Sequence, residues 1–408
     1  MDHIRILSRS LFHHSSSSSN HTCPSVTESS PTIVPLVGSM TYHTLTAIIA
    51  AICLIITTVL AAISLIRHAT HYSSPTQQRQ ILRIICLMPW VALITFLSVL
   101  SESVGPYIAP AVDFGVALAI SAFLLLLCDF VLAGPDGFDD LFGEGATARG
   151  QFNMHSPPWL KRVWYLVLQF IPVSIILWIA TAASMAAGTY CATSNKPYFA
   201  HIWITVLQGF LEGAALFSVL RFYNIMILKL TPYGVMMKLI AFKGIVFLSF
   251  LQNIILGLLV SFHVIKPSKY MTYHDISIGL PNLVLACETP IFAAFIMVAY
   301  STKPYTSLKV GRAYQGGPGG IKAILAALNY SDILSSFVRG PMRLVREQHQ
   351  LVKPADSIGL MTPSSYESGP PNASQGYSNP PTYQPVQQPY DNGQNIPINP
   401  EAWEREHV

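Results

Sequence analysis

Charged side chains are scarce in this chain: of 408 residues only 11% are Asp, Glu, Lys or Arg, whereas 51% are hydrophobic. Soluble domains carry about 25% charged residues, and the mean hydropathy here is +0.44. So few charges cannot screen so much apolar surface from water, which excludes an ordinary soluble protein and favours a membrane protein. The net charge of +4 is too small to indicate a nucleic-acid partner.

Motifs of soluble enzymes are missing as well. The chain has no Walker loop, no complete GxGxxG and no Cys/His cluster with metal-ligand spacing. His68 and His71 stand three residues apart but have no further ligands nearby in the sequence. MDHIRILSRSLF has too short an apolar stretch for a secretory signal. We therefore expect no enzyme, no cofactor and no metal site.

Long apolar runs are what the chain has instead. Seven of them approach the length of about 20 residues that crosses a bilayer core. They are 46–66, 84–100, 112–131, 164–188, 202–222, 244–265 and 280–300. Lipid offers no hydrogen bonds to peptide groups, and strand-like alternation is absent, so each run should be a helix. The sequence predicts an all-α, multi-pass membrane protein with seven transmembrane helices.

Lysine and arginine near these runs predict the orientation. They gather in the first, third and fifth loops and after the last run, whereas the other loops hold only Lys196, Lys266 and Lys269. Basic residues favour the cytoplasmic side. We expect the N-terminus outside or in a lumen, the C-terminus in the cytoplasm, and the protein in a plasma, vacuolar or endosomal membrane.

Four segments differ in composition. Residues 1–42 form a polar, Ser-rich head that we expect to be disordered, and 43–305 form the seven-helix body. Residues 306–352 contain an amphipathic pattern that fits a helix on the membrane interface or one packed on the loops. Residues 353–408 are rich in Pro, Tyr, Asn and Gln, which predicts a disordered cytoplasmic tail.

The outer side carries two candidate modifications. Asn20 opens an Asn-His-Thr glycosylation sequon, although such triplets also arise by chance. Cys23 and Cys191 both fall outside, where disulfides persist, so they are a candidate bridge. The other four cysteines lie in apolar runs, where a cysteine usually serves as small apolar filler.

The tail contains one recognisable peptide motif. Pro380, Pro381 and Tyr383 form PPTY, a PPxY segment that suits the aromatic groove of a WW domain. Such domains occur in ubiquitin ligases that sort membrane proteins, so a ligase is a candidate partner. A tail this rich in proline and tyrosine also produces PPxY by accident.

Polar residues in the last three runs lie on helical faces. They are Gln208 and Glu212 in the fifth run, Ser249, Gln252 and Asn253 in the sixth, and Asn282 and Glu288 in the seventh. Polar groups in a membrane helix are costly and usually face protein or a hydrated cavity. Pro290 cannot donate to the carbonyl of Ala286, which predicts a kink and a free carbonyl beside Glu288. The faces either line a solute path or hydrogen-bond the helices together.

Several stretches in chain order resemble the organic solute transporter alpha family, which includes transmembrane protein 184. HATHYSSPTQQRQILRI is similar to a family pattern, and so are MKLIAFKGIVFLSFLQ and NLVLACE. The positions that carry the resemblance are His68, Tyr72, Pro75, Gln78, Arg79, Arg83, Lys238, Lys243, Phe247, Ser249, Phe250, Gln252, Asn282 and Glu288. Where the family has Tyr-Glu-Ala this chain has Gly115, Val116 and Ala117, and a family cysteine is replaced by Ala286.

The resemblance implies seven spans and, in some members, export of sterol-like or bile-acid-like amphipaths. We expect facilitated or ion-coupled transport without ATP hydrolysis, by one chain, a homo-oligomer or a complex with a partner subunit. The expected path residues are Glu288, Asn282, Gln252, Asn253, Glu212, Gln208 and Lys243, with Lys243 attracting an anionic head group. The alternative is a membrane scaffold or trafficking protein that acts through its tail. A seven-helix receptor is disfavoured because neither a DRY-like triplet nor NPxxY is present.

Overall fold

The computed structural model describes the helical body and little of the chain's ends. Described are residues 34–36, 38–101, 103–134, 136–144, 156–191, 196–262, 264–265, 268–272, 275–306, 314–342 and 344. These residues form helices joined by turns, with no extended strand among them, so the all-α prediction is confirmed. The head and tail segments fall almost entirely outside the described residues.

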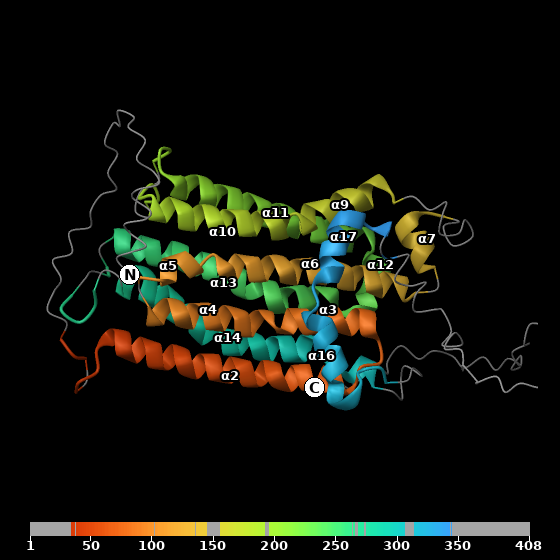
Figure 1. Cartoon of the computed structure of the whole chain (residues 1–408), viewed down its shortest axis with the longest axis horizontal. Helices are drawn as coiled ribbons and strands as arrows, with labels where there is room; N and C mark the ends of the chain where they lie inside the picture. The colour runs from red at the N-terminus through yellow and green to blue at the C-terminus, as the bar shows by residue number, and fades with distance from the viewer. Residues whose placement is uncertain are drawn as a thin grey trace, which may run out of the picture. The chain divides into compact units, whose positions relative to one another are not determined.

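Each of the seven apolar runs corresponds to a long helical segment. In chain order these are α2 (Tyr42–Thr70), α3 (Pro75–Ile85) with α4 (Leu87–Leu100), α5 (Gly105–Ile108) with α6 (Ala111–Leu132), α9 (Pro158–Leu168) with α10 (Phe170–Ala186), α11 (Ala200–Ile225), α13 (Val235–Ser261) and α14 (Leu280–Ala299). They lie side by side along the long axis of the body (Figure 1). We call its two ends the Tyr42 end and the Thr70 end, after the limits of α2.

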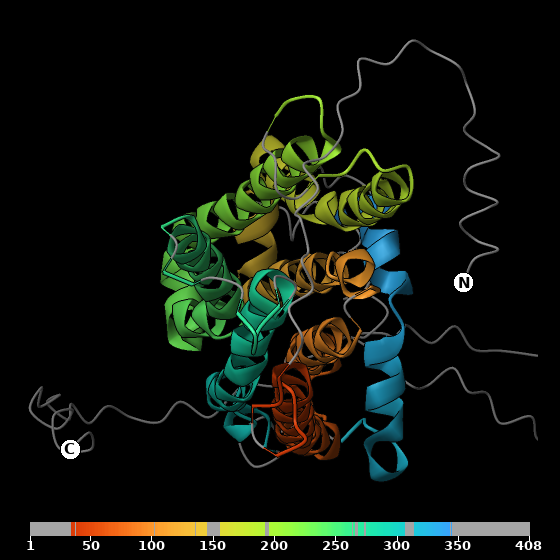
Figure 2. The same ribbon diagram turned by 90° about the vertical axis from the view of Figure 1, so that its left-hand side faces the viewer.

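An eighth segment, Pro318–Arg339, is also long and apolar enough to count as a candidate span. It consists of the short turn η5 (Pro318–Gly320), α16 (Ile321–Leu328) and α17 (Ser331–Arg339). Figures 1 and 2 show α16 and α17 crossing the other helices near the Thr70 end rather than running along them. Their outward apolar side chains are exposed, among them Leu325, Leu334 and Val338. The pair thus has an exposed apolar side, and its place in the membrane interface or on the loops stays a prediction.

The helix α6 forms the centre of the body. In its most apolar stretch 89% of the residues are buried, against 17% in α11 and 22% in α2. A Cβ atom on Gly115 would stand 2.4 Å from Cδ1 of Trp90, so only glycine lets the α4 indole pack this close to α6. Trp90 Nε1 in turn donates to the carbonyl of Ala111, 2.7 Å away.

The helix α13 begins at Val235, nine residues before the sixth apolar run was expected to begin. Because Lys238 and Lys243 are charged, the sequence predicted a loop over the first part of this segment. In the structure both ammonium groups have partners: Lys238 donates to the carbonyl of Tyr233, and Lys243 donates to the Glu212 carboxylate. Internal partners therefore allow charged residues inside the helix.

Candidate functional site

A cavity of about 490 Å³ opens in the half of the body nearest the Tyr42 end. Five of the long segments contribute to its wall: α5 with α6, α10, α11, α13 and α14. Its size falls within the range of about 300–1,000 Å³ that is typical of small-molecule sites. Its lining mixes apolar, aromatic and polar side chains, as such sites do.

Three of the expected path residues, Gln208, Gln252 and Asn282, line this cavity. They come from three different helices, so the structure brings the three polar faces together at one place. The Gln208 side-chain amide is buried at Nε2 and lies beside the carboxyl group of Asp113. Asn282 Nδ2 donates to the carbonyl of Ile278 at 2.9 Å. The Asn253 side chain lies outside the described residues.

Asp113 is the functional candidate that the sequence analysis missed. It stands at the start of α6, lines the cavity and lies beside Gln208 and within electrostatic range of Glu212 and Lys243. The signal was available, because Asp113 is one of two acids, with Asp129, in the apolar run 112–131.

Three hydroxyl groups of the cavity wall use their protons within their own helices. Ser174 donates to the carbonyl of Ile171, Thr181 to that of Leu177, and Ser249 to that of Val246, at 2.8–2.9 Å. A hydroxyl has one proton and two acceptor lone pairs. These three groups can therefore offer a bound molecule only acceptor sites.

Glu212 and Lys243 form an ion pair between α11 and α13. Glu212 follows Gln208 by one helical turn, so the pair lies on the Thr70 side of the cavity, and neither residue lines it. Lys243 is buried, and its side chain is 11% exposed against 20% for Glu212. The carboxylate satisfies the ammonium within the protein, so no anionic solute is needed to explain Lys243.

Glu288 is half-buried on α14 and does not line the cavity, whose wall ends at Leu285 on that helix. Its Oε2 atom is buried and has no hydrogen-bond partner among the described residues. A role for Glu288 in a path stays a prediction, since the cavity stops about one turn before it.

The carbonyl that Pro290 leaves without a backbone donor is not free. Thr289 donates its hydroxyl to the carbonyl of Ala286 at 2.8 Å, and the Thr57 hydroxyl of α2 donates to Thr289 Oγ1 at 2.9 Å. The expectation of a free carbonyl is thus wrong, because the neighbouring side chain replaces the missing N–H. The helix α14 continues through Pro290 to Ala299.

Replacing Thr289 with valine should destabilise the protein by about 1–3 kcal/mol, because it leaves the buried carbonyl of Ala286 unpaired. Thr289→Ser keeps the hydroxyl and should lose much less. The measurement is the fraction of detergent-solubilised protein that stays monodisperse after heating. Equal stability of the valine and serine variants would contradict the role of this hydroxyl.

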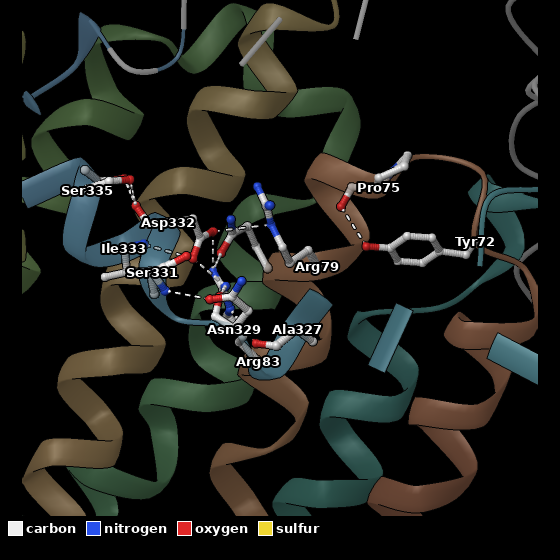
Figure 3. A network of polar contacts seen from close by, with 12 residues as sticks. Tyr72, Pro75, Arg79, Arg83, Ala327, Asn329, Ser331, Asp332, Ile333 and Ser335 are labelled. Carbon is white, nitrogen blue, oxygen red and sulfur yellow. Dashed lines mark hydrogen bonds and ion pairs between the residues drawn. The ribbon is translucent and has the colours of Figure 1, made fainter. Parts of the chain in front are cut away.

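The family-motif residues before and in α3 build a junction at the Thr70 end. His68 Nε2 donates to the carbonyl of Tyr300 at 2.8 Å, which ties α2 to the end of α14. Gln78 Oε1 accepts from the backbone N–H groups of Ser73 and Ser74. Tyr72 donates to the carbonyl of Pro75 at 3.1 Å (Figure 3). These contacts are structural and lie away from the cavity.

Arg83 fastens α16 and α17 to α3 (Figure 3). Its Nη1 and Nη2 atoms donate to the two carboxylate oxygens of Asp332 at 2.8 and 2.5 Å. The other donors reach the carbonyls of Ala327 and Asn329 and the Gln80 side chain, so all five guanidinium N–H groups are used. Arg79 Nε lies 3.3 Å from the same carboxylate.

The remaining motif residues lie in the cavity wall, at the Thr70 end or on the outer surface of α13. Ser249 lines the cavity, whereas Lys238 belongs to the Thr70 end, where its carbonyl accepts from the Tyr300 hydroxyl at 3.1 Å. Phe247 is 64% exposed on the outside of α13.

Cys191 is buried and disulfide-bonded. Its expected partner, Cys23, lies outside the described residues, and the pairing stays a prediction. Asn20 and the PPTY residues Pro380, Pro381 and Tyr383 lie outside them too. Cys53, Cys86, Cys128 and Cys287 are free thiols. No group of three or more potential metal ligands occurs in the part that the structure describes.

Residues 46–305 match the family described as Organic solute transporter Ostalpha. Among curated proteins, a vacuole membrane protein of Schizosaccharomyces pombe is 24% identical over 256 residues, 60% of this chain and 59% of that protein. A transmembrane protein 184 homolog of Dictyostelium discoideum is 24% identical over 259 residues, 60% of this chain and 50% of that protein. No solved structure matches.

The chain thus spans about three fifths or less of the length of these curated relatives. Several long apolar helices and the family match together identify a multi-pass integral membrane protein. The matched region contains all seven expected spans almost completely, and the resemblance seen in the sequence motifs is confirmed. This chain belongs to the organic solute transporter Ostalpha family.

Proposed function

We propose that the protein moves an amphipathic organic solute across a membrane without hydrolysing ATP, and that the cavity is where the solute enters. The observation that carries this proposal is the cavity itself, whose wall combines Gln208, Gln252 and Asn282 with apolar side chains from several helices. Such a wall accommodates an apolar body and a polar head in one place. Family membership supports transport as the class of function.

The solute would leave the cavity along the contacts of α11, α13 and α14 towards the Thr70 end. The Glu212–Lys243 ion pair lies between α11 and α13 just beyond Gln208. Passage would therefore require this pair to separate or the solute to pass beside it. The distribution of basic residues in the loops favours the cavity opening to the outside or to a lumen. The name of the fission yeast relative favours a vacuolar location.

Filling the cavity with a large side chain should slow transport strongly. Ser249→Trp places an indole against the cavity wall, whereas Phe247→Trp places one on the exposed side of the same helix. In proteoliposomes we expect the first change to slow solute uptake about tenfold or more, a barrier increase of ~1.4 kcal/mol, and the second to leave it unchanged. The assay uses labelled taurocholate, a labelled neutral sterol and labelled benzyltrimethylammonium.

A role as a scaffold that acts through the tail is the alternative, supported by the PPTY sequence alone. The same assay separates the two functions. A transporter shortened after residue 353 should keep its uptake, because the cavity residues precede that point. Absence of uptake of every solute by the full chain would contradict transport and leave the scaffold.

A further inference from the structure

The described part of the cavity wall carries a negative formal charge and no positive one. Among the described residues that line the cavity, Asp113 is the one charged side chain, and none of them is a lysine, arginine or histidine. Lys243, a described cation within electrostatic range of Asp113, is paired with Glu212 outside the wall. A carboxylate in a partly desolvated cavity attracts cations and repels anions more strongly than it would in water.

The polar groups around Asp113 strengthen this preference. The hydroxyls of Ser174, Thr181 and Ser249 have used their protons on backbone carbonyls, so they present acceptors. The Asn282 amide N–H₂ bonds to Ile278, and no donor among the described residues reaches its Oδ1 atom. These acceptors match a ligand with N–H or polarised C–H donors. The amide N–H₂ group of Gln208 is a donor of the same wall, and it lies beside the Asp113 carboxylate.

Two aromatic rings complete the wall. Trp178 lines the cavity, and its Nε1 donates to the carbonyl of Tyr107 at 2.7 Å, which holds the indole in place. Tyr190 also lines it, and its ring packs edge-on against His201 with ring centroids 5.1 Å apart. Aromatic faces attract ammonium groups, and tryptophan does so most strongly.

We propose that the cavity binds an amphipathic organic cation, a protonated amine or quaternary ammonium with an apolar body, in preference to an anionic amphipath. Asp113 pairs with the charge, the rings of Trp178 and Tyr190 in the same wall attract it, and the apolar wall takes the body. This inference rests on the proposed transport function and gives its substrate class. It replaces the expectation of a bile-acid-like anion, whose charge would meet the Asp113 carboxylate.

The test uses full-length protein in liposomes and labelled benzyltrimethylammonium as the probe, with neopentylbenzene as its uncharged isostere and taurocholate as an anion. We expect saturable uptake of the cation that neither of the other two inhibits. Asp113→Asn should weaken binding of the cation by about tenfold or more. Asp113→Glu keeps a carboxylate and should retain part of the cation binding. Trp178→Leu should weaken cation binding less than Asp113→Asn does. Asp140→Asn removes a carboxylate near the Thr70 end, where Asp140 pairs with Lys229, and should change nothing.

Competition in the wild-type protein decides the question even where a variant fails to fold. Equal inhibition of uptake by the cation and its uncharged isostere would overturn the inference, and so would a folded Asp113→Asn variant with unchanged cation uptake. Uptake of taurocholate or a sterol, without the cation, would overturn the inference and leave the proposed transport intact. Absence of any uptake would overturn both.

Discussion

Arg83→Met should destabilise the protein by about 3–5 kcal/mol, because it leaves the buried carboxylate of Asp332 without its bidentate partner. The Arg83 side chain is 1% exposed and the Asp332 side chain 8% exposed, so water cannot replace the lost contacts. The same change also removes the donors to the carbonyls of Ala327 and Asn329. We expect α16 and α17 to detach from α3.

The double variant Arg83→Met/Asp332→Leu removes both charges and should recover part of the lost stability, because the Asp332 carboxylate is no longer buried without its partner. Arg79, the second cation at this carboxylate, is 20% exposed and keeps contact with water. Recovery should be incomplete, since the carbonyls of Ala327 and Asn329 still lack the Arg83 donors. Arg67→Met is the matched control, because Arg67 is exposed at the same end of the body, and its effect should stay within about 0.5 kcal/mol. Stability is followed by the monodisperse fraction after heating in detergent. A single variant as stable as the wild type, or a double variant worse than the single one, would contradict this account.

Lys243→Met should also be strongly destabilising, by about 3 kcal/mol, because the Glu212 carboxylate then stays between α11 and α13 without its cation. Combining it with Glu212→Leu should restore much of the stability. The same double variant, Lys243→Met/Glu212→Leu, also tests whether the ion pair takes part in transport. If the pair must separate during passage, the double variant should still carry solute, with altered kinetics.

A second ion pair in the same chain supplies the control. Lys229 and Asp140 lie 3.0 Å apart, with side chains that are 45% and 24% exposed. Lys229→Met breaks a lysine–carboxylate pair that water reaches, so it should cost about 1 kcal/mol or less. Equal costs for Lys229→Met and Lys243→Met in the same heating assay would show that the buried position of the Glu212–Lys243 pair has no energetic significance.

Each of these predictions depends on a partner far away in the chain. Arg83 and Asp332 are separated by 249 positions, and Lys243 and Glu212 by 31. The sequence marked Arg83 as a motif residue and Lys243 as a path residue. It could not say that both cations are held by carboxylates of this chain, because a pairing across helices leaves no local pattern.

The helical class, the membrane location and the positions of the long helices follow from the sequence by itself. Long apolar runs must satisfy their backbone hydrogen bonds internally, so each has one stable conformation in lipid. The start of α13 was predicted too late in the chain, because Lys238 and Lys243 were taken as evidence against a membrane helix. A lysine in a helix is acceptable when tertiary structure supplies a partner, as Glu212 does for Lys243.

Only the tertiary structure decided which polar residues meet. Gln208, Gln252 and Asn282 converge on one cavity, Asp113 joins them from a fourth helix, and Glu288 stands apart. It also decided that Thr289 satisfies the carbonyl left free by Pro290. The physical reason is common to all of these cases. Helical periodicity determines which face of one helix a residue occupies, whereas helix packing determines which faces of different helices touch.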